Sequence, residues 1–486
     1  MALSKLLAFL WIIAFPCITN AQFNRLTKSD KTAIEEMITD QKESENMVGL
    51  SVGIIQNGEV AYLKGFGFQD SLKNIKATEN TVYRLASVSK SVTGLLSMRL
   101  VEKNLLNLDK DIRYYIPEYP EKPEGIITSE DLLSNESGII HYSGSGDCQG
   151  AYNKTARNNY ADNHKSTYDP VEALKVFKDQ KICFKPGEHY QYTTWGFCLL
   201  GAVIERAAKS PFEEVLYNEL VCPLDLPTLQ IEFPDKLPYP NETQGYRVDG
   251  GKVSLADEGN FDFGNVSYKV PGGGLISSVV DLTLLMKGIV NREFIKDETV
   301  KLFGSRHIPD DGKPSFYGYG TSSNFRNGDT LFWHSGSQSK TATLIYYSPE
   351  NKNGVAIMCN TKNVNLYPLA RLIYDYLPNS SLSGPEYAAS SGQSKCNPGI
   401  TAEFKNKNIE ISPNPSGRLV NIKMEANKGQ IGIVLLDELG RRVFHKNIDY
   451  APEQSININA DSGNYQMLII QDKTIIHRKH IVVLKQ

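Results

Sequence analysis

Hydrophobic positions repeat with helical spacing near the N-terminus and then alternate along the chain. In "RLTKSDKTAIEEMITDQ" the apolar residues Ile34, Met37 and Ile38 lie three or four positions apart or side by side, which predicts a helix. The next stretch, "GLSVGIIQNGEVAYLKGFG", alternates around Asn57 and Gly58, a pair typical of the tight turn between two antiparallel strands. A helix followed by a β-hairpin therefore opens the first folded unit.

A helical middle region follows, and more strands end this first unit. The segment "TATLIYYSPENKNGVAIMCN" predicts two strands around a polar turn, and "TTWGFCLLGAVIERAAKS" has the spacing of an amphipathic helix. The strands from both ends of the region would have to pair in one sheet. We therefore predict an α+β fold, an α/β sandwich in which helices flank an antiparallel sheet and an all-helical region is inserted.

A stretch rich in Ser, Gly and Pro separates this unit from a different pattern. The segment "PNSSLSGPEYAASSGQSKCNPG" lacks helical or strand periodicity and is typical of a linker. Beyond it, short alternating runs such as "RLVNIKM", "IGIVLL" and "NYQMLII" are separated by turn signals. We predict a leader at residues 1–21, a mixed domain at 24–377, a linker at 378–399 and a small β-sandwich at 400–486.

The first residues indicate export. The segment "MALSKLLAFLWIIAFPCITNAQ" has one lysine, an apolar run from Leu6 to Phe15 and a polar end, as in a secretory signal peptide cleaved after Ala21. The apolar run is too short to span a bilayer, and a buried helix is the alternative interpretation. We expect a secreted or cell-surface protein without a transmembrane segment in its mature chain.

Composition excludes some classes of partner and cofactor. The 486 residues have a net charge of −3, with 41% hydrophobic and 22% charged residues, as in a globular protein that does not bind nucleic acid. The sequence contains no phosphate-binding loop, no HExxH motif and no paired CxxC. We therefore expect neither a metal nor another cofactor.

Export would place the cysteines in an oxidising compartment, where disulfides form. Cys148 and Cys183 flank one polar, irregular stretch and are the favoured pair, although sequence alone does not determine the pairing. Cys198 and Cys359 lie in apolar runs, which is typical of buried free thiols.

Two Ser-x-x-Lys sequences occur, "SVSK" from Ser87 to Lys90 and "SQSK" from Ser337 to Lys340. A chain of this length and composition is expected to contain roughly two by chance, so the pattern alone identifies no site. Apolar residues follow the first match on more than one side of a predicted helix, so that helix should be buried. No helical pattern follows the second match, which we expect to be a strand edge or a turn.

The first match can place a hydroxyl and an amine on one face of a buried helix. Residues three apart share a helix face, so the amine of Lys90 can lie over the hydroxyl of Ser87. Burial favours the neutral amine, which can then act as a base toward the serine. In the alternative interpretation Ser87 is a helix N-cap and Lys90 a solvated surface residue.

Two segments further along the chain carry candidate partners for this pair. Tyr192 follows a Pro-Gly turn in "FKPGEHYQYTTWG", and His334, Ser335 and Gly336 lie on a predicted strand in "LFWHSGSQSK". A buried tyrosine near a lysine can transfer protons if the ammonium lowers its pKa. A glycine on a strand allows a ligand to approach the backbone closely.

Taken in order, these segments resemble the penicillin-recognising serine hydrolases, which include AmpC-type β-lactamases, D,D-peptidases and related esterases. The resemblance runs roughly from Asn46 to Leu377 and is carried by "YRLASVSKSVTGLL", "LLSNESGIIHY", "QYTTWGFCLLG", "PGGGLISSVVDL" and "WHSGSQSKTATLIYYSPE". It implies a β-lactamase/transpeptidase-like fold. It also implies that Ser87 is the acylated nucleophile, Lys90 its proton acceptor and Tyr192 the proton shuttle.

The resemblance further implies an oxyanion hole and a substrate-binding strand. The oxyanion hole would be formed by the backbone N–H groups of Ser87 and Ser337. The residues implied to bind substrate are Thr194, His334, Ser335 and Gly336. His334 stands where many members have lysine, and its charge is expected to change near pH about 6.5.

One position departs from the family pattern. The usual Tyr-x-Asn motif reads Tyr192-Thr193-Thr194 here, so a hydroxyl with one donor replaces an amide with two. This version is similar to that of the mitochondrial serine β-lactamase-like protein of animals, and it disfavours β-lactam hydrolysis while leaving acyl transfer intact. We expect a serine hydrolase that cleaves small peptides, D-amino-acid derivatives or esters through an acyl-enzyme. A β-lactamase proper and a non-catalytic protein that binds peptidoglycan peptides are the alternatives.

The C-terminal part resembles the sorting domain of type IX secretion in Bacteroidetes. The segments that carry this resemblance are "ISPNPSGRLVNIKM", "VLLDELGRRVF", "DSGNYQMLII" and a basic end. It implies that the type IX machinery is a partner, and that passage through the outer membrane is followed by release or surface attachment. A generic accessory β-domain is the alternative.

Overall fold

The computed structural model describes residues 23–142, 152–234, 241–256, 264–387, 409–412, 419–424, 430–436, 442–449, 451–460, 463–471 and 474–483. The predicted leader at 1–21 lies outside these residues, as do Cys148 and positions 388–399 of the predicted linker.

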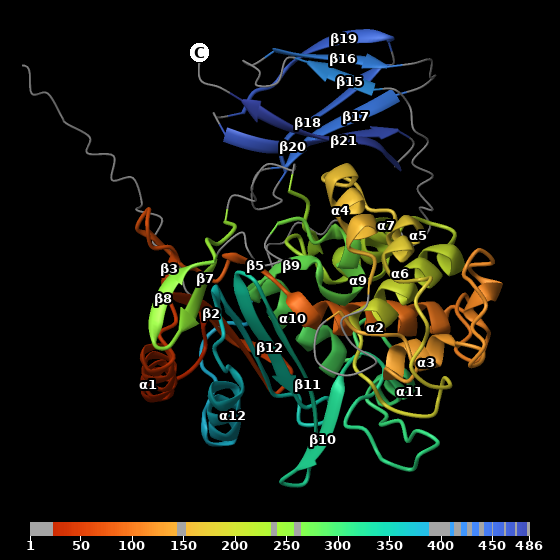
Figure 1. Cartoon of the computed structure of the whole chain (residues 1–486). Helices are drawn as coiled ribbons and strands as arrows, with labels where there is room; N and C mark the ends of the chain where they lie inside the picture. Colours follow the sequence, from red (N-terminus) through yellow and green to blue (C-terminus); the bar gives the residue numbers. More distant parts are fainter. Residues whose placement is uncertain are drawn as a thin grey trace, which may run out of the picture.

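One eight-stranded antiparallel sheet forms the centre of the first domain (Figure 1). Its order is β1-β3-β2-β13-β12-β11-β10, with the short β4 paired to β3, so strands from both ends of the domain meet at the β2–β13 pair. The strands are β1 (Phe23–Asn24), β2 (Gly49–Gln56), β3 (Glu59–Asp70), β4 (Ile75–Lys76), β10 (Ser322–Arg326), β11 (Asp329–Gln338), β12 (Thr341–Tyr347) and β13 (Gly354–Cys359).

The predicted hairpin is present between β2 and β3. Asn57 has φ of 53° and Gly58 has φ of 80°, the left-handed conformations that the tightest hairpin turn requires at both central positions. Together with the flanking helices described next, the sheet confirms the predicted α+β architecture.

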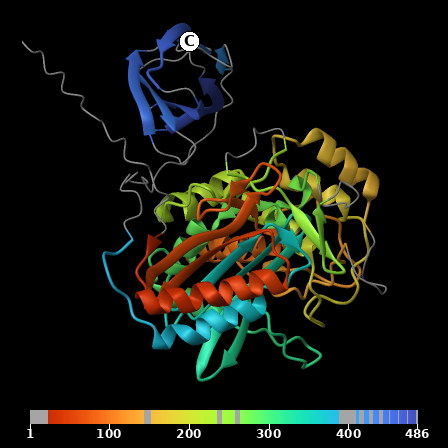
Figure 2. The ribbon, with the colours of Figure 1, turned by 90° about the vertical axis from the view of Figure 1, so that its left-hand side faces the viewer.

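Helices cover both faces of the sheet. Helices α1 (Lys28–Ser44) and α12 (Tyr367–Tyr376) lie side by side across one face, as Figure 2 shows. Their buried side chains form a core with the strand residues that face them, among them Val52 and Ile54. Helix α10 (Val279–Val290) packs on the opposite face, where Gly53 leaves room for it.

The inserted region lies on the α10 side and packs around two long buried helices, α2 (Ser89–Glu102) and α6 (Thr194–Ala208). The shorter helices of this region and its border are α3 (Ser129–Ser134), α4 (Lys154–Asn163), α5 (Pro170–Ala173), α7 (Phe212–Leu216), α8 (Cys222–Leu224), α9 (Val270–Gly273) and α11 (Asp297–Phe303). Two small sheets complete the domain: β5 (Val82–Arg84), β9 (Leu275–Ser278) and β6 (Gln230–Ile231) form one, and β14 (Thr361–Lys362), β7 (Tyr246–Asp249) and β8 (Lys252–Leu255) form the other.

The C-terminal strands form two layers of their own (Figure 1). One sheet contains β15 (Ile409–Ser412), β16 (Leu419–Met424) and β19 (Glu453–Asn457). The other contains β17 (Gln430–Leu436), β18 (Arg442–Asp449), β20 (Gly463–Gln471) and β21 (Thr474–Val483). Alternate side chains from both sheets, such as Ile422, Ile433 and Met467, form the core between them, as in the predicted sandwich.

The start of the predicted linker packs on the first domain. Leu382 forms a β-bridge with Leu26, and the ring of Tyr387 lies edge-on to that of Phe23 with 4.8 Å between centroids. The packed chain therefore continues to Tyr387, beyond the expected boundary at Leu377.

The cysteines agree with the expectations as far as the described residues reach. Cys198 and Cys359 are buried free thiols, which confirms that prediction. Cys183 is disulfide-bonded, and so is Cys222. Because Cys148 is outside the described residues, its pairing with Cys183 stays a prediction.

Candidate active site

The serine turn, residues Ala86–Val88, is a single 3₁₀ turn that joins β5 to α2. Ala86 has φ of +46°, a left-handed conformation that costs a non-glycine residue roughly 1–2 kcal/mol. A side-chain carbon added to Gly336 of β11 would lie 2.4 Å from the carbonyl oxygen of Leu85 and 3.0 Å from the nitrogen of Ser87. The glycine therefore allows β11 to lie directly against the serine turn.

A buried ion pair anchors the strand that leads into this turn. Arg84 donates hydrogen bonds of 2.6 Å from Nε and from Nη2 to the carboxylate of Glu232. The carbonyl oxygen of Arg84 accepts the hydroxyls of Thr341 and Thr343 on β12, each at 3.0 Å. Since bidentate ion pairs restrict geometry, the end of β5 is held against the sheet three residues before Ser87.

Lys90 lies in the first turn of α2, a helix that buries eleven of its 14 residues. Its Nζ is 3.2 Å from Oγ of Ser87, and it donates to Oγ1 of Thr194 at 3.1 Å and to the carbonyl oxygen of Gly272 at 2.7 Å. Burial, assisted by the charge of Lys269, holds the pKa of Lys90 well below its ordinary value. This shift favours the neutral form of the amine, and that form can accept a proton from the serine hydroxyl.

These contacts decide between the two interpretations of "SVSK". Lys90 is 0% exposed, so it is not a solvated surface residue. The N-cap of α2 is Val88 and makes no side-chain capping bond, so Ser87 is not a helix cap. Ser87 is half-buried, within reach of the amine, as the catalytic interpretation requires.

The second match has the expected structure of a strand end and turn. Ser337 and Gln338 end β11, and Ser339 and Lys340 form the turn to β12, with φ of 76° at Lys340. This turn offers its serine no rigid helix start and no lysine from a following helix.

Tyr192 lies beside the serine–lysine pair, and its side chain hydrogen-bonds Ser87. Lys90 Nζ is 4.6 Å from the centroid of its ring. Burial raises the pKa of Tyr192 well above its ordinary value, and the hydrogen bond with Ser87 only partly opposes this. The condition for a proton shuttle, an ammonium that lowers the pKa of Tyr192, is therefore not met: burial dominates and raises this pKa.

The threonines after Tyr192 fix the start of α6. Thr193 caps this helix by accepting the N–H of Gly196 at 3.4 Å. The hydroxyl of Thr194 accepts a hydrogen bond from the amine of Lys90, and the backbone N–H of Thr194 donates to Nδ1 of His141 at 3.1 Å. The hydroxyl of Thr194 thus replaces the family's amide as a partner of the lysine.

The strand β11 presents its residues to the site alternately. Ser335 and Ser337 are exposed, and His334 and Gly336 are buried. Nε2 of His334 accepts the hydroxyl of Tyr317 at 2.8 Å, and its Nδ1 donates to the carbonyl oxygen of Ser335 at 2.7 Å. Burial lowers the pKa of His334 to about 3, so the expected change of charge near pH 6.5 is wrong and the imidazole is neutral throughout that range.

Four residues that support the site were not predicted: Asn135, His141, Gly272 and Tyr317. The first three lie within the motifs quoted from the sequence, and Tyr317 does not. Asn135 has φ of 61° and accepts the N–H of Thr193 at 2.9 Å through its side chain. Tyr317 belongs to an irregular loop, where no periodicity in the sequence distinguishes one aromatic residue from another.

A hollow of about 640 Å³ adjoins the site on the side of Tyr317. Aromatic side chains line much of it, among them Tyr190, Phe316 and Trp333. The rings of Tyr190 and Tyr192 both lie about 6 Å from that of Tyr317, at 6.0 and 6.1 Å between centroids. The hollow is therefore continuous with the wall of the candidate active site.

Within the described residues, no cluster of histidine, cysteine and carboxylate side chains could hold a metal ion. No helix among the described residues is both long enough and apolar enough to cross a membrane.

Residues 34–376 match the protein family described as Beta-lactamase, and the chain belongs to that family. Residues 410–483 match the family described as Secretion system C-terminal sorting domain. Both resemblances inferred from the sequence motifs are thus confirmed.

Particular relatives are distant in sequence. Protein flp of Staphylococcus aureus (strain N315) is 24% identical over 339 residues, which cover 69% of this chain and 64% of flp. The human serine beta-lactamase-like protein LACTB, mitochondrial, is 28% identical over 295 residues, 50% of this chain and 53% of that protein. The chain therefore spans less than two thirds of the length of these relatives.

Solved structures show the same fold. EstCE1, described as a hydrolase with promiscuous acyltransferase activity, superposes with a TM-score of 0.59 at 20% identity, covering 72% of this chain and 98% of EstCE1. A likeness at this identity establishes the architecture alone.

Proposed function

We propose that this protein is an exported serine hydrolase that forms an acyl-enzyme on Ser87 and cleaves amide or ester bonds in small peptides, D-amino-acid derivatives or esters. The observation that carries the proposal is the fully buried Lys90, whose amine lies 3.2 Å from Oγ of Ser87 and whose pKa is held well below its ordinary value. Lysine is almost never fully buried unless it has a partner or a task. The hydrolase activity that the description of EstCE1 names agrees with this assignment.

In the proposed mechanism the neutral amine of Lys90 accepts the Ser87 proton while Oγ attacks the substrate carbonyl carbon. The oxyanion of the tetrahedral intermediate is stabilised by the backbone N–H groups of Ser87 and Ser337. When the intermediate collapses, the bond to the leaving amine or alkoxide breaks, and the proton passes from Lys90 through the hydroxyl of Tyr192 to the leaving group. Water then attacks the acyl-enzyme, gives its proton to the same relay, and releases the acid as Ser87 regains its proton.

Two features favour neutral esters and amides over β-lactams. The hydroxyl of Thr194 already accepts Lys90, so this position lacks the free amide donor that an asparagine would offer. His334 is neutral and both ring nitrogens are engaged, so it supplies no positive charge for the carboxylate that β-lactams carry.

We expect kcat/KM for nitrocefin to be at least about 100-fold below that for p-nitrophenyl esters, which corresponds to about 2.7 kcal/mol in transition-state stabilisation. The measurement compares both chromogenic substrates, and a D-alanine p-nitroanilide, on the purified mature chain. Thr194→Asn is the matched variant and should raise the nitrocefin-to-ester ratio. Comparable rates on nitrocefin and esters would contradict the substrate assignment.

We propose that the C-terminal β-sandwich directs export by type IX secretion. The support is the match of residues 410–483 to secretion sorting domains and the self-contained core of that sandwich. On this proposal the enzyme works outside the cell or on its surface.

Truncation after Ser391 should leave the hydrolase inside the native host. The expected result is loss of the protein from the medium and the cell surface by immunoblot, with the truncated chain still present in the cell fraction. Full-length Ser87→Ala is the control, since it keeps the sandwich and should be exported normally. A truncated chain that reaches the medium as efficiently as this control would show that the sandwich has another task.

A further inference from the structure

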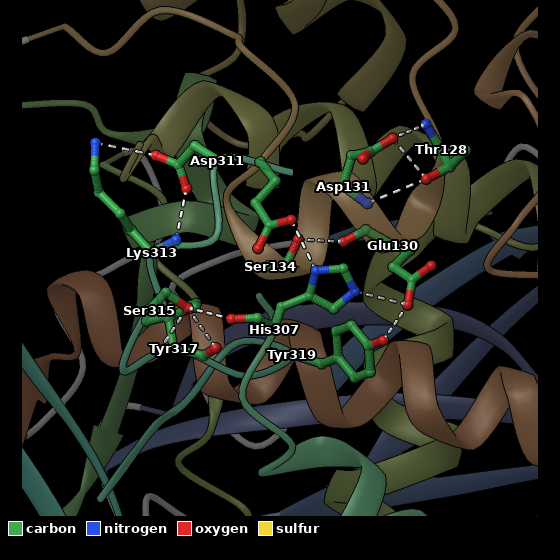
Figure 3. A network of polar contacts seen from close by, with 11 residues as sticks. Thr128, Glu130, Asp131, Ser134, His307, Asp311, Lys313, Ser315, Tyr317 and Tyr319 are labelled. Atoms are coloured by element: carbon green, nitrogen blue, oxygen red, sulfur yellow. Dashed lines mark hydrogen bonds and ion pairs between the residues drawn. The ribbon is translucent and has the colours of Figure 1, made fainter. Parts of the chain in front are cut away.

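His307 is held between two carboxylates next to the active site. Its Nδ1 lies 2.8 Å from Oε2 of Glu136, and its Nε2 lies 3.2 Å from Oε1 of Glu130. Tyr319 donates a hydrogen bond to the same oxygen of Glu130, and Figure 3 shows His307 and Tyr319 converging on this carboxylate. A side chain from one loop is thus joined to two side chains from another part of the chain.

The burial of Glu136 indicates that this cluster is built around a charge. Its side chain is 1% exposed, and a buried carboxylate is strongly unfavourable unless a cation faces it. The groups that face His307 in the described part of the chain are Glu130 and Glu136 from one side and Tyr319 from its own loop. The hydrogen bonds with Glu130 and then Glu136 raise the pKa of His307 to about 10, so it carries the required charge at neutral pH.

On the carboxylate side, the contacts lead to Tyr192. Glu136 belongs to the support turn, residues 135–138, which follows α3. The preceding residue, Asn135, accepts the N–H of Gln191 at 2.8 Å through its carbonyl oxygen and the N–H of Thr193 at 2.9 Å through its side chain. The support turn therefore holds the backbone on both sides of the tyrosine.

On the histidine side, the contacts lead to β11 and α2. His307 belongs to the bridging loop, residues 304–321, which connects α11 to β10. The hydroxyl of Ser315 donates to the carbonyl oxygens of His307 and Tyr317, a contact visible in Figure 3, and the hydroxyl of Tyr317 donates to His334. The carbonyl oxygen of Gly320, later in the loop, accepts the hydroxyl of Ser91 at 2.8 Å, one residue after Lys90.

We propose that His307 is a positioning residue, whose ion pairs with Glu136 and Glu130 fasten the bridging loop to the support turn and so fix the distance between the Tyr192 and His334 walls of the active site. This inference rests on the proposed function, because it assigns a role in the turnover that Ser87 performs. His307 touches neither the nucleophile nor the base in any contact described above, so its effect is exerted through Asn135 and Tyr317.

His307→Gln tests the proposal, because glutamine can still form hydrogen bonds but cannot supply the charge. We expect kcat/KM for p-nitrophenyl esters at pH 7 to fall by at least about ten-fold, chiefly in kcat, since small displacements of catalytic groups reduce rate more than binding. Glu136→Gln should cause a similar loss. The decrease in kcat/KM of the double variant should be no larger than that of the more impaired single variant, because both changes break the same ion pair between His307 and Glu136.

The pH profile separates this role from a general loss of stability. In the wild type the ion pairs weaken as pH rises toward about 10, so kcat/KM should fall there, and this alkaline decrease should be absent in His307→Gln. Urea unfolding of each variant shows whether the chain is folded under assay conditions. Arg326→Gln is the matched control, because it breaks a bidentate, partly exposed ion pair with Asp375 of α12, and it should retain kcat/KM within about two-fold.

Several outcomes would overturn the proposal. A folded His307→Gln protein with wild-type kcat/KM and an unchanged alkaline decrease would show that the ion pairs of His307 do not position the site. The proposal would also be contradicted if the decreases in kcat/KM of the two single variants multiplied in the double variant. It would equally be contradicted if the decrease in each variant matched the fraction of unfolded protein determined by urea unfolding. A wild-type protein that turns over neither p-nitrophenyl esters nor the D-alanine p-nitroanilide would refute the proposed hydrolase function instead.

Discussion

Replacing Ser87 with alanine should lower kcat/KM for p-nitrophenyl esters by on the order of 10⁴-fold or more, because removal of a nucleophile abolishes the acyl-enzyme route. In Ser337→Ala the same kcat/KM should fall by no more than about ten-fold, since the proposed role of Ser337 uses its backbone N–H, which alanine retains. The comparison is informative because each serine begins a Ser-x-x-Lys sequence. Ser87 is half-buried in the turn beside β11, and Ser337 is exposed on β11 itself. Steady-state kinetics on the two purified variants measures it.

Labelling by a fluorophosphonate provides the control for this pair of variants. The probe should modify the wild type and Ser337→Ala and should leave Ser87→Ala unmodified. The reverse pattern, with Ser87→Ala labelled and Ser337→Ala unlabelled, would contradict the assignment of the nucleophile.

Replacing Lys90 with methionine should lower the acylation rate by about 10²–10⁴-fold, the range that general bases contribute. Methionine fills similar space in the buried helix but accepts no proton. Lys90→Arg should be as slow, because arginine keeps a positive charge and does not lose its proton at any accessible pH. Stopped-flow measurement of the acylation burst distinguishes this step from deacylation. An arginine variant with near wild-type acylation would show that charge, and not proton acceptance, is the contribution of Lys90.

Lys90→Met also tests the ionisation of Lys90, through the pH dependence of the free energy of unfolding. The pKa of Lys90 is far lower in the folded than in the unfolded chain, so between these two values the unfolded state binds more protons. The free energy of unfolding of the wild type should therefore rise with pH across that window, by up to about 1.4 kcal/mol per pH unit for one group. Lys90→Met should lack this increment, so the wild type should gain stability relative to it as pH rises from 6 to 9. An equal pH dependence of the two proteins would show that Lys90 is charged in the folded state.

Local patterns were sufficient to predict most of the architecture. The spacing of Ile34 and Ile38 and the Asn57-Gly58 pair specify a helix and a turn through short-range physics, and both are present. The apolar residues around Ser87 likewise predicted a helix buried on most sides, with Lys90 inside it. Here burial was the decisive property, because it separates a base from a surface lysine.

The electrostatics of the site could not be predicted, because they arise from residues distant in sequence. Whether His334 is charged depends on how deeply β11 is covered, and Tyr317, which contacts it, comes from an irregular loop. Whether an ammonium lowers the pKa of Tyr192 was open in the sequence; in the structure desolvation dominates, and it raises the pKa of Tyr192 and lowers that of Lys90. Asn135 was contained in a recognised motif, yet its role requires a left-handed backbone conformation that the motif does not reveal.

The most direct test of an acyl-enzyme on Ser87 is peptide mapping of the fluorophosphonate-labelled wild type by mass spectrometry. Trypsin should release "LASVSK", residues 85–90, and "NGDTLFWHSGSQSK", residues 327–340, as separate peptides. We predict one adduct per chain, in the first peptide, with fragment ions that place it on Ser87. An adduct in the second peptide, or an intact protein mass unchanged after prolonged labelling of folded enzyme, would contradict the account.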